Sequence, residues 1–328
     1  MRSLTLHTPE GVRDIYNSEY ERKLDTLYTL RKSISKFGYM PISTPTFEYF
    51  DTFSKEVGSC SANEMYKFIY REGNTLVLRP DITPSVARAA AMYFSECETP
   101  VRLSYEGNVF RNYHSLQGRL KESTQVGGEF IGVSTPEADA EILTIVVNNL
   151  KAVGLKNFEI GVGHVDIIKG LIEETKLDDE GMDNLTKLIA NKNFFGAVDI
   201  VKNSVNDSNL IKLFEFAGKI LDNPSEWQEC LEYAKPFEKV YNALDYLTKL
   251  YAILKENQVT DYISFEFGML SEYKYYTGII FAGYTYGTGE PIVKGGRYDS
   301  LLAQFGKDAA AIGFAIMVDQ LMFALERQ

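Results

Sequence analysis

The sequence is poor in the residues that most often bind metals or act as nucleophiles. Its 328 residues include three histidines, three cysteines and one tryptophan. The cysteines are odd in number, lie far apart and lack the paired spacing of a zinc site or a disulfide framework. We therefore expect no metal or other cofactor, and reduced thiols in a cytoplasmic protein. The cysteines are Cys60, Cys97 and Cys230.

Long apolar runs and an excess of basic residues are also missing. The start, MRSLTLHTPEGVRDI, has no apolar core, so no secretory signal is expected. The most apolar stretch, Ala309 to Val318, is too short to span a bilayer, so no membrane partner is expected. There are 34 Lys and Arg against 45 Asp and Glu, a net charge of −11. Nucleic-acid binding needs clustered Lys and Arg, which this balance disfavours.

What the sequence does contain is an alternation of helical and extended patterns. Antiparallel strands interleaved with helices favour an α+β fold over a doubly wound parallel sheet. The charged stretch 166–253 predicts a mainly helical insertion. Helices are predicted over 18–37, from Thr83 (as N-cap) onward, from Thr135 to about Lys151, and over 310–325 with Gly313 permitting close packing. Strands are predicted over 75–79, 101–111, 124–131, 262–267, 275–284 and 291–294.

Polar motifs fall at the ends of several of these elements. Asp81 and Glu129 are acceptors suited to an ammonium or imidazole N–H. Arg111 ends a strand, where a guanidinium suits a carboxylate or phosphate. Tyr275 and Tyr276 point to opposite sides of an extended segment, so at most one is expected to line a given pocket. The motifs are LRPDITPSVAR (78–88), GNVFR (107–111), TQVGGEFIG (124–132), YKYYTGIIFAGY (273–284) and KGGRYDSLLAQFG (294–306).

Together and in this order, these motifs resemble those of histidyl-tRNA synthetases. The resemblance runs from about Thr8 to Leu325 and includes TPEGVRD, LRPDITPSVARA, the FR hairpin, YYTG and GGRYDxLxxxFG. It implies the class II aminoacyl-tRNA synthetase core over 1–165 and 254–328, with the helical insertion 166–253 between them. It also implies a dimer interface around Pro45. No anticodon-binding domain is expected, because the chain ends where a synthetase continues.

Three departures from the synthetase pattern fall on positions used for adenylation. Tyr113 stands where the family has the glutamate that holds adenine, and Ser271 stands where it has the arginine of R-G-L-D-Y-Y. Gln320 stands where the third class II motif ends in an arginine. Negative charge develops on the α-phosphate during adenylation, so the loss of these two arginines, together with the loss of the adenine partner, argues against aminoacylation.

The resemblance also implies that a histidine pocket is kept. In it, Asp81, Thr83 and Gln125 would meet the ammonium, although Asp81 replaces a longer glutamate. The imidazole would be met by Glu129, Tyr276 and Tyr298, with Tyr275 in the same set, and the carboxylate by Arg111.

A synthetase-like chain without adenylation residues resembles the regulatory subunit of short-form ATP phosphoribosyltransferase, the first enzyme of histidine biosynthesis. The resemblance implies a non-catalytic subunit that activates a catalytic partner and mediates feedback inhibition by L-histidine. It further implies homodimers within a hetero-octamer, and no tRNA partner. Two alternatives stay open. One is an adenylating ligase, and Arg111 and the GGRYD segment support it. The other is a scaffold with a vestigial pocket, in which Asp81 caps a helix and Glu129 pairs with a buried tyrosine.

Overall fold

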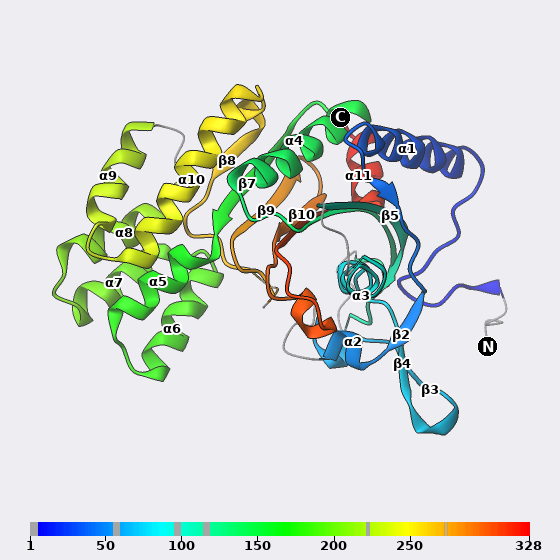
Figure 1. Cartoon of the computed structure of the whole chain (residues 1–328), viewed down its shortest axis with the longest axis horizontal. Helices are drawn as coiled ribbons and strands as arrows, with labels where there is room; N and C mark the ends of the chain where they lie inside the picture. Colours follow the sequence, from blue (N-terminus) through cyan, green and yellow to red (C-terminus); the bar gives the residue numbers. More distant parts are fainter. Residues whose placement is uncertain are drawn as a thin grey trace.

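The structure is a computed structural model that describes residues 6–54, 60–94, 100–113, 119–220, 224–271, 273 and 275–328, so Cys97 lies outside it. Its centre is an eight-stranded sheet (Figure 1) with the order β1-β5-β6-β11-β10-β9-β7-β8. The pairs β1–β5 and β7–β8 are parallel and the others antiparallel, which confirms the expected α+β class. The strands are β1 (Met40–Pro41), β5 (Val101–Phe110), β6 (Glu122–Ile131), β11 (Ala311–Met317), β10 (Val293–Arg297), β9 (Ile279–Thr285), β7 (Phe158–His164) and β8 (Ile263–Phe265).

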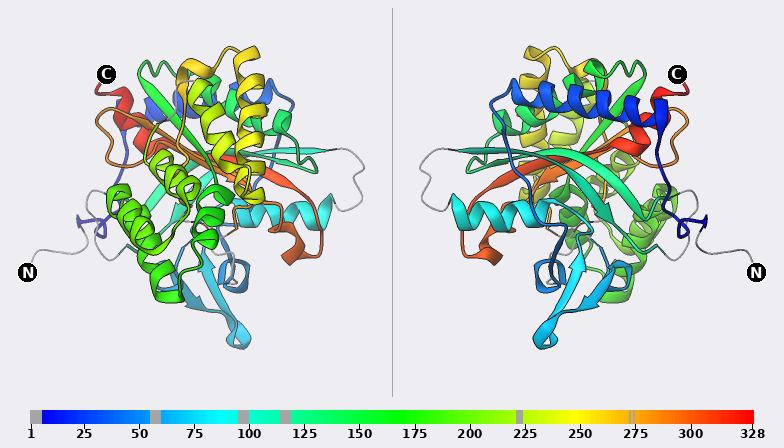
Figure 2. Two further views of the ribbon diagram at one scale, coloured as in Figure 1. Left: turned by 90° about the vertical axis from the view of Figure 1, so that its left-hand side faces the viewer. Right: turned by 90° about the vertical axis from the view of Figure 1, so that its right-hand side faces the viewer.

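Helices cover both faces of this sheet. One face packs against α1 (Asn17–Ser35), α4 (Pro136–Ala152), α10 (Glu238–Glu256) and α11 (Val318–Leu325). The opposite face packs against α3 (Thr83–Tyr93) and the 3₁₀ turn η5 (Leu302–Phe305), as Figure 2 shows for α1 and α3. The site described below lies on the α3 face.

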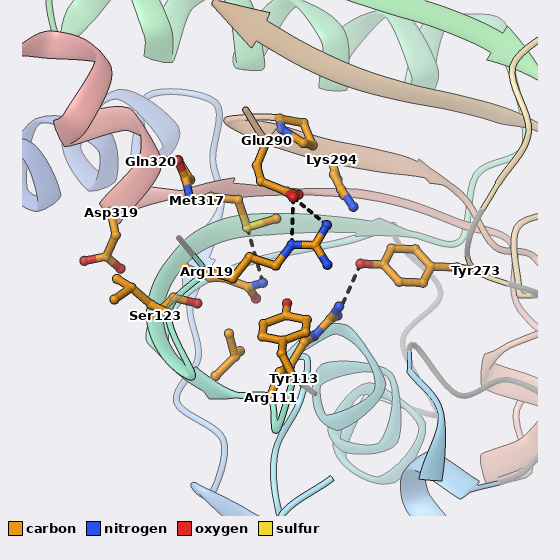
Figure 3. A pocket seen from close by; sticks show the side chains of 14 residues that line it. Arg111, Tyr113, Arg119, Ser123, Tyr273, Glu290, Lys294, Met317, Asp319 and Gln320 are labelled. Atoms are coloured by element: carbon orange, nitrogen blue, oxygen red, sulfur yellow. Dashed lines mark hydrogen bonds and ion pairs between the residues drawn. The ribbon is translucent and has the colours of Figure 1, made fainter. Parts of the chain in front are cut away.

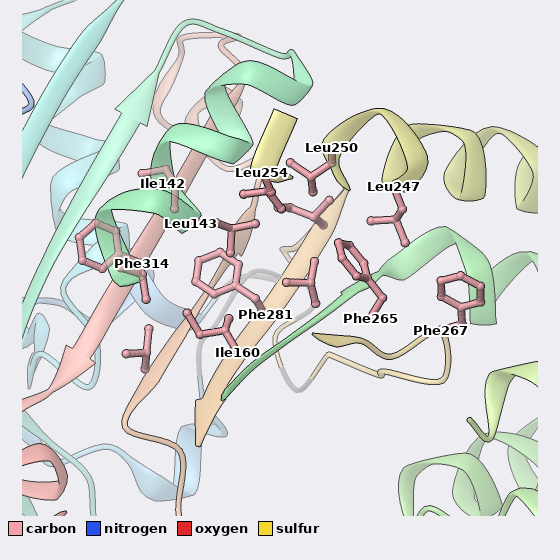
Figure 4. Packing of buried hydrophobic residues seen from close by; sticks show 14 of the residues in the cluster. Ile142, Leu143, Ile160, Leu247, Leu250, Leu254, Phe265, Phe267, Phe281 and Phe314 are labelled. Atoms are coloured by element: carbon pink, nitrogen blue, oxygen red, sulfur yellow. The ribbon is translucent and has the colours of Figure 1, made fainter. Parts of the chain in front are cut away.

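The larger core lies between the sheet and the helices α4 and α10. Figure 4 shows leucines and isoleucines of these two helices meeting aromatic and aliphatic side chains of the sheet. Alternation along β6 sends Val126 and Phe130 into this core, and it therefore turns Gln125 and Glu129 toward α3. The pleat of one strand thus separates a dry core from a polar site.

A bundle of helices joins β7 to β8. Because β7 and β8 are parallel, their connection must cross over, and α10 brings the chain back along the sheet. Trp227 packs edge-on against Phe265 at a centroid distance of 4.7 Å and so ties the bundle to the sheet edge. That residues 166–253 form an insertion separate from the core stays a prediction. The other helices of the bundle are α5 (Val165–Thr175), α6 (Asp179–Ala190), α7 (Phe194–Ser204), α8 (Ser208–Ala217) and α9 (Pro224–Ala234).

A small second sheet has the order β2-β4-β3 and projects away from α1 (Figure 2). None of the helices in the described residues is long and apolar enough to cross a membrane. The elements of this part are β2 (Phe47–Tyr49), β3 (Lys67–Ile69), β4 (Thr75–Leu78), α2 (Asp51–Ser54), and the 3₁₀ turns η2 (Ala62–Glu64) and η3 (Arg71–Gly73), with η4 (Thr260–Tyr262) before β8.

Two predicted elements are wrong in part. The helix expected over 310–325 is strand β11 followed by α11. Because β11 lies in the middle of the sheet and is buried on both faces, its apolar run lacks the alternation that marks a half-buried strand. The strand expected over 275–284 begins only at Ile279, and the two tyrosines precede it.

Candidate functional site

A buried carboxylate, Glu129, lies at the centre of the α3 face. The Thr83 hydroxyl donates to its Oε1 at 2.8 Å, and the Tyr298 hydroxyl donates to its Oε2 at 2.5 Å. The expectation that Thr83 caps its helix is wrong, since Ile82 holds the cap position and the hydroxyl turns to Glu129. Burial raises the pKa of Glu129 to about 8, although the hydrogen bonds from Tyr298 and Thr83 oppose the shift. The carboxyl group of Glu129 therefore stays protonated to a much higher pH than an exposed glutamate does.

Room for this carboxylate is provided by Gly313 on the neighbouring strand. Gly313 pairs with Glu129 across β6 and β11, and a Cβ at Gly313 would overlap Oε2 of Glu129. The expectation that Gly313 serves helix packing is therefore wrong. A side chain at this position would push Glu129 out of its place.

Tyrosines surround the acidic centre. Tyr275 donates to Oδ2 of Asp81 at 3.3 Å, and Oδ1 of Asp81 accepts the backbone N–H of Ile82 at 2.8 Å. The rings of Tyr275 and Tyr276 meet edge to face at 4.8 Å, and both line the same pocket. The expectation that only one of them would do so is wrong, because the segment is not extended there. Burial raises the pKa of both hydroxyls well above the ordinary value, so they remain donors.

Gln125 lines the same pocket with an amide that is poorly satisfied. Among the described residues, its Nε2 donates to the thioether of Met317, at 3.5 Å, and its buried Oε1 has no hydrogen-bond partner. Leaving a buried amide oxygen unpaired costs free energy, about 1–3 kcal/mol. A ligand ammonium would supply the missing donor.

The structure brings most of the predicted residues together. The amino-acid pocket, as we name it, is lined by seven of the eight together with Tyr273, Lys294, Gly295 and residues of β11. The eighth, Arg111, lines an adjoining cavity that shares Gln125, Tyr273 and Lys294 with the pocket. The seven are Asp81, Thr83, Gln125, Glu129, Tyr275, Tyr276 and Tyr298.

The adjoining cavity (Figure 3) also contains two of the three departures, Tyr113 and Gln320. Nε of Arg119 donates to Oε1 of Glu290 at 2.7 Å across this cavity. The third departure, Ser271, lies elsewhere, and its hydroxyl donates to the Tyr273 carbonyl. The described residues contain no cluster of three or more His, Cys, Asp or Glu side chains that could hold a metal ion.

Comparison with known proteins gives this site its context. A family model described as histidyl-tRNA synthetase matches residues 11–321. An ATP phosphoribosyltransferase regulatory subunit of Acetivibrio thermocellus is 38% identical over 328 residues, covering 100% of this chain and 78% of that protein. One from Clostridium acetobutylicum is 38% identical over 332 residues, covering 99% and 80%. The chain belongs to the ATP phosphoribosyltransferase regulatory subunit family.

One solved structure agrees with this family assignment, and a second, more distant one shares the fold. A regulatory subunit/histidyl-tRNA synthetase from Bacillus halodurans matches with a TM-score of 0.88 and 33% identity, covering 97% of this chain and 83% of that one. A histidyl-tRNA synthetase from Nostoc sp. PCC 7120 matches with a TM-score of 0.80 at 20% identity, covering 98% and 75%, and this likeness concerns the fold. The predicted class II synthetase-like fold is confirmed.

Three side chains of the candidate site in this regulatory subunit were not predicted from the sequence. Tyr273 and Lys294 line both the amino-acid pocket and the adjoining cavity, and Arg119 lines the cavity. The sequence could have indicated Tyr273 and Lys294, because each is the first residue of one of the motifs given in the sequence analysis. Nothing in the pattern marked Arg119, because its partner Glu290 lies 171 positions away in the chain.

Proposed function

We propose that this chain is a non-catalytic regulatory subunit that activates an ATP phosphoribosyltransferase and mediates feedback inhibition by L-histidine. The observation that carries the proposal is the amino-acid pocket, whose lining includes acceptors that suit an ammonium and an acceptor that suits an imidazole N–H. Family membership supplies the expected partner, a short-form catalytic subunit. Histidine regulates only if it binds one state of the complex more tightly than another.

The chemistry of L-histidine fits the polar groups in this pocket. Asp81, the Thr83 hydroxyl and the unpartnered oxygen of Gln125 would accept the ammonium protons. Glu129, flanked by Tyr276 and Tyr298, would accept the imidazole N–H. Arg111, in the adjoining cavity, would meet the carboxylate.

The scaffold alternative accounts for part of this arrangement. Glu129 is indeed bonded to the buried Tyr298, and Asp81 to the helix start at Ile82. It does not account for Gln125, whose buried oxygen has no hydrogen-bond partner in the part of the chain that the structure describes. This atom favours a pocket that still takes a ligand.

We propose further that the chain does not catalyse aminoacylation. Ser271 and Gln320 provide no cation for a phosphate, and Arg119 is held by Glu290. We also propose a cytoplasmic homodimer within a hetero-octamer, without tRNA. The second sheet supports self-association, because Phe47 and Tyr49 are 54% and 56% exposed there.

The test is the rate of a short-form catalytic subunit with and without this chain, and then with added L-histidine. We expect activation that histidine reverses. In Glu129→Gln, activation should persist and the histidine effect should weaken at least tenfold, whereas the exposed control Glu180→Gln should match the wild type. Activation untouched by histidine would leave only the scaffold role, and no activation would overturn the proposal. Histidine-dependent exchange of pyrophosphate into ATP would instead support the ligase alternative.

A further inference from the structure

We infer that Tyr273 lowers the affinity of the pocket for ligands that carry a carboxylate, because its hydroxyl accepts a hydrogen bond from Nη2 of Arg111, the guanidinium proposed to bind that carboxylate. The inference rests on the proposed histidine site and adds to it a residue that sets specificity. It concerns Arg111, the one predicted ligand contact that lies outside the amino-acid pocket proper.

Arg111 already has two acceptors in the protein. Its Nε donates to the Pro80 carbonyl at 3.0 Å, which fixes the orientation of the guanidinium. Its Nη2 donates to the Tyr273 hydroxyl at 3.3 Å, on the side that faces the shared wall of the two cavities. Figure 3 shows the Tyr273 hydroxyl directed at Arg111 across the cavity.

The position of the Tyr273 ring is tied to the pocket. It stacks on Tyr275 at a centroid distance of 5.4 Å with planes 7° apart, and it lies 5.7 Å from Tyr276. The Lys294 ammonium lies 5.9 Å from the ring centroid and the Arg111 guanidinium 6.0 Å. Ring contacts with the two pocket tyrosines therefore hold this phenol where its hydroxyl meets Arg111.

A carboxylate that binds at Nη2 of Arg111 competes with the Tyr273 phenol for this donor. An ionised acceptor forms a stronger hydrogen bond with a guanidinium than a neutral hydroxyl does. A carboxylate that approaches Arg111 can therefore displace Tyr273, but its affinity is reduced by the free energy of the bond that it breaks. A ligand with the same ammonium and imidazole but no carboxylate leaves this bond intact.

The experiment compares Tyr273→Phe with wild type in calorimetric titrations of the full chain with L-histidine and with histamine, which lacks the carboxylate. The variant keeps the ring and removes the acceptor. We expect its Kd for L-histidine to fall about three- to tenfold, the range for one hydrogen bond. The Kd for histamine should stay within about twofold. The exposed control Tyr286→Phe should leave both values unchanged.

A second variant makes the outcome specific to Arg111. In an Arg111→Ala background, Tyr273→Phe should no longer change the affinity for L-histidine, because the competition is gone. Unchanged or weaker L-histidine binding by Tyr273→Phe, or an equal gain for histamine, would overturn the inference while leaving the histidine site in place. If the wild type bound neither ligand, alone or with its catalytic partner, both proposals would fail.

Discussion

At the scale of single residues, the chemistry of the site depends on one buried carboxyl group with a raised pKa, that of Glu129. Glu129 is enclosed on β6, receives hydroxyl hydrogen bonds from Thr83 and Tyr298, and has a pKa raised to about 8 by burial. In the unfolded chain the same group titrates at about 4.3. Folding and ligand binding are therefore both linked to the proton on Glu129.

Stability should depend on pH through this group. Because the folded pKa is raised, the contribution of protonated Glu129 is full below about pH 4.3 and is lost as pH rises through about 8. We expect the wild type to lose stability relative to Glu129→Gln between pH 5 and 8, by on the order of a few kcal/mol. Thermal unfolding of both proteins over this range is the measurement, and parallel curves would contradict the prediction.

Histidine binding should release a proton from the protein. An imidazole N–H is best accepted by the ionised carboxylate, so binding draws Glu129 toward its charged form. Affinity should therefore rise with pH up to about 8. Titrations at pH 7.5 in two buffers of different ionisation enthalpy measure the proton, and Glu129→Gln should show none. A binding enthalpy independent of buffer in the wild type would refute the linkage.

At the scale of elements, the register of β6 against β11 builds the pocket floor. Gly313 lies opposite Glu129 and leaves the space that the carboxylate fills. In Gly313→Ala we expect loss of at least tenfold in histidine affinity and destabilisation by about 1–3 kcal/mol. The control Gly289→Ala adds a methyl group where nothing lies within 4 Å, and it should change neither quantity. Calorimetry and urea unfolding report both, and wild-type affinity in Gly313→Ala would contradict the account.

A buried ion pair joins β10 to α4 and α10. The guanidinium of Arg297, next to Tyr298, donates to Asp139, which also accepts the Tyr246 hydroxyl of α10 at 2.7 Å. Asp139→Asn leaves the buried guanidinium without its charged partner on α4, so we expect a loss of about 3–5 kcal/mol in the free energy of unfolding. Asp183→Asn breaks an exposed pair with Lys187 and should cost less than about 1 kcal/mol. Urea unfolding compares them, and equal costs would show that burial does not matter here.

At the scale of the whole molecule, ordered motifs predicted the fold better than local patterns did. The interleaved strand and helix signals supported the α+β class, and the resemblance added the class II architecture. Local reasoning failed at β11, where burial on both faces removed the alternation, and at Tyr275 and Tyr276, where an extended segment was assumed. The pairings Arg119–Glu290 and Arg111–Tyr273 join positions too far apart in the chain for any local pattern to reveal.

The parallel pairing of β7 with β8 has a consequence for how the chain folds. The two strands are neighbours in the sheet, yet the whole helical bundle from Val165 to Glu256 lies between them in sequence. Closing so long a connection costs entropy before the pairing returns any free energy, whereas consecutive helices meet through short separations. We therefore expect the helical bundle to fold first and β8 to pair with β7 at the sheet edge late in folding. During synthesis, β7 would have no strand partner on either edge until β8 and β9 had emerged, because both follow it in the sequence.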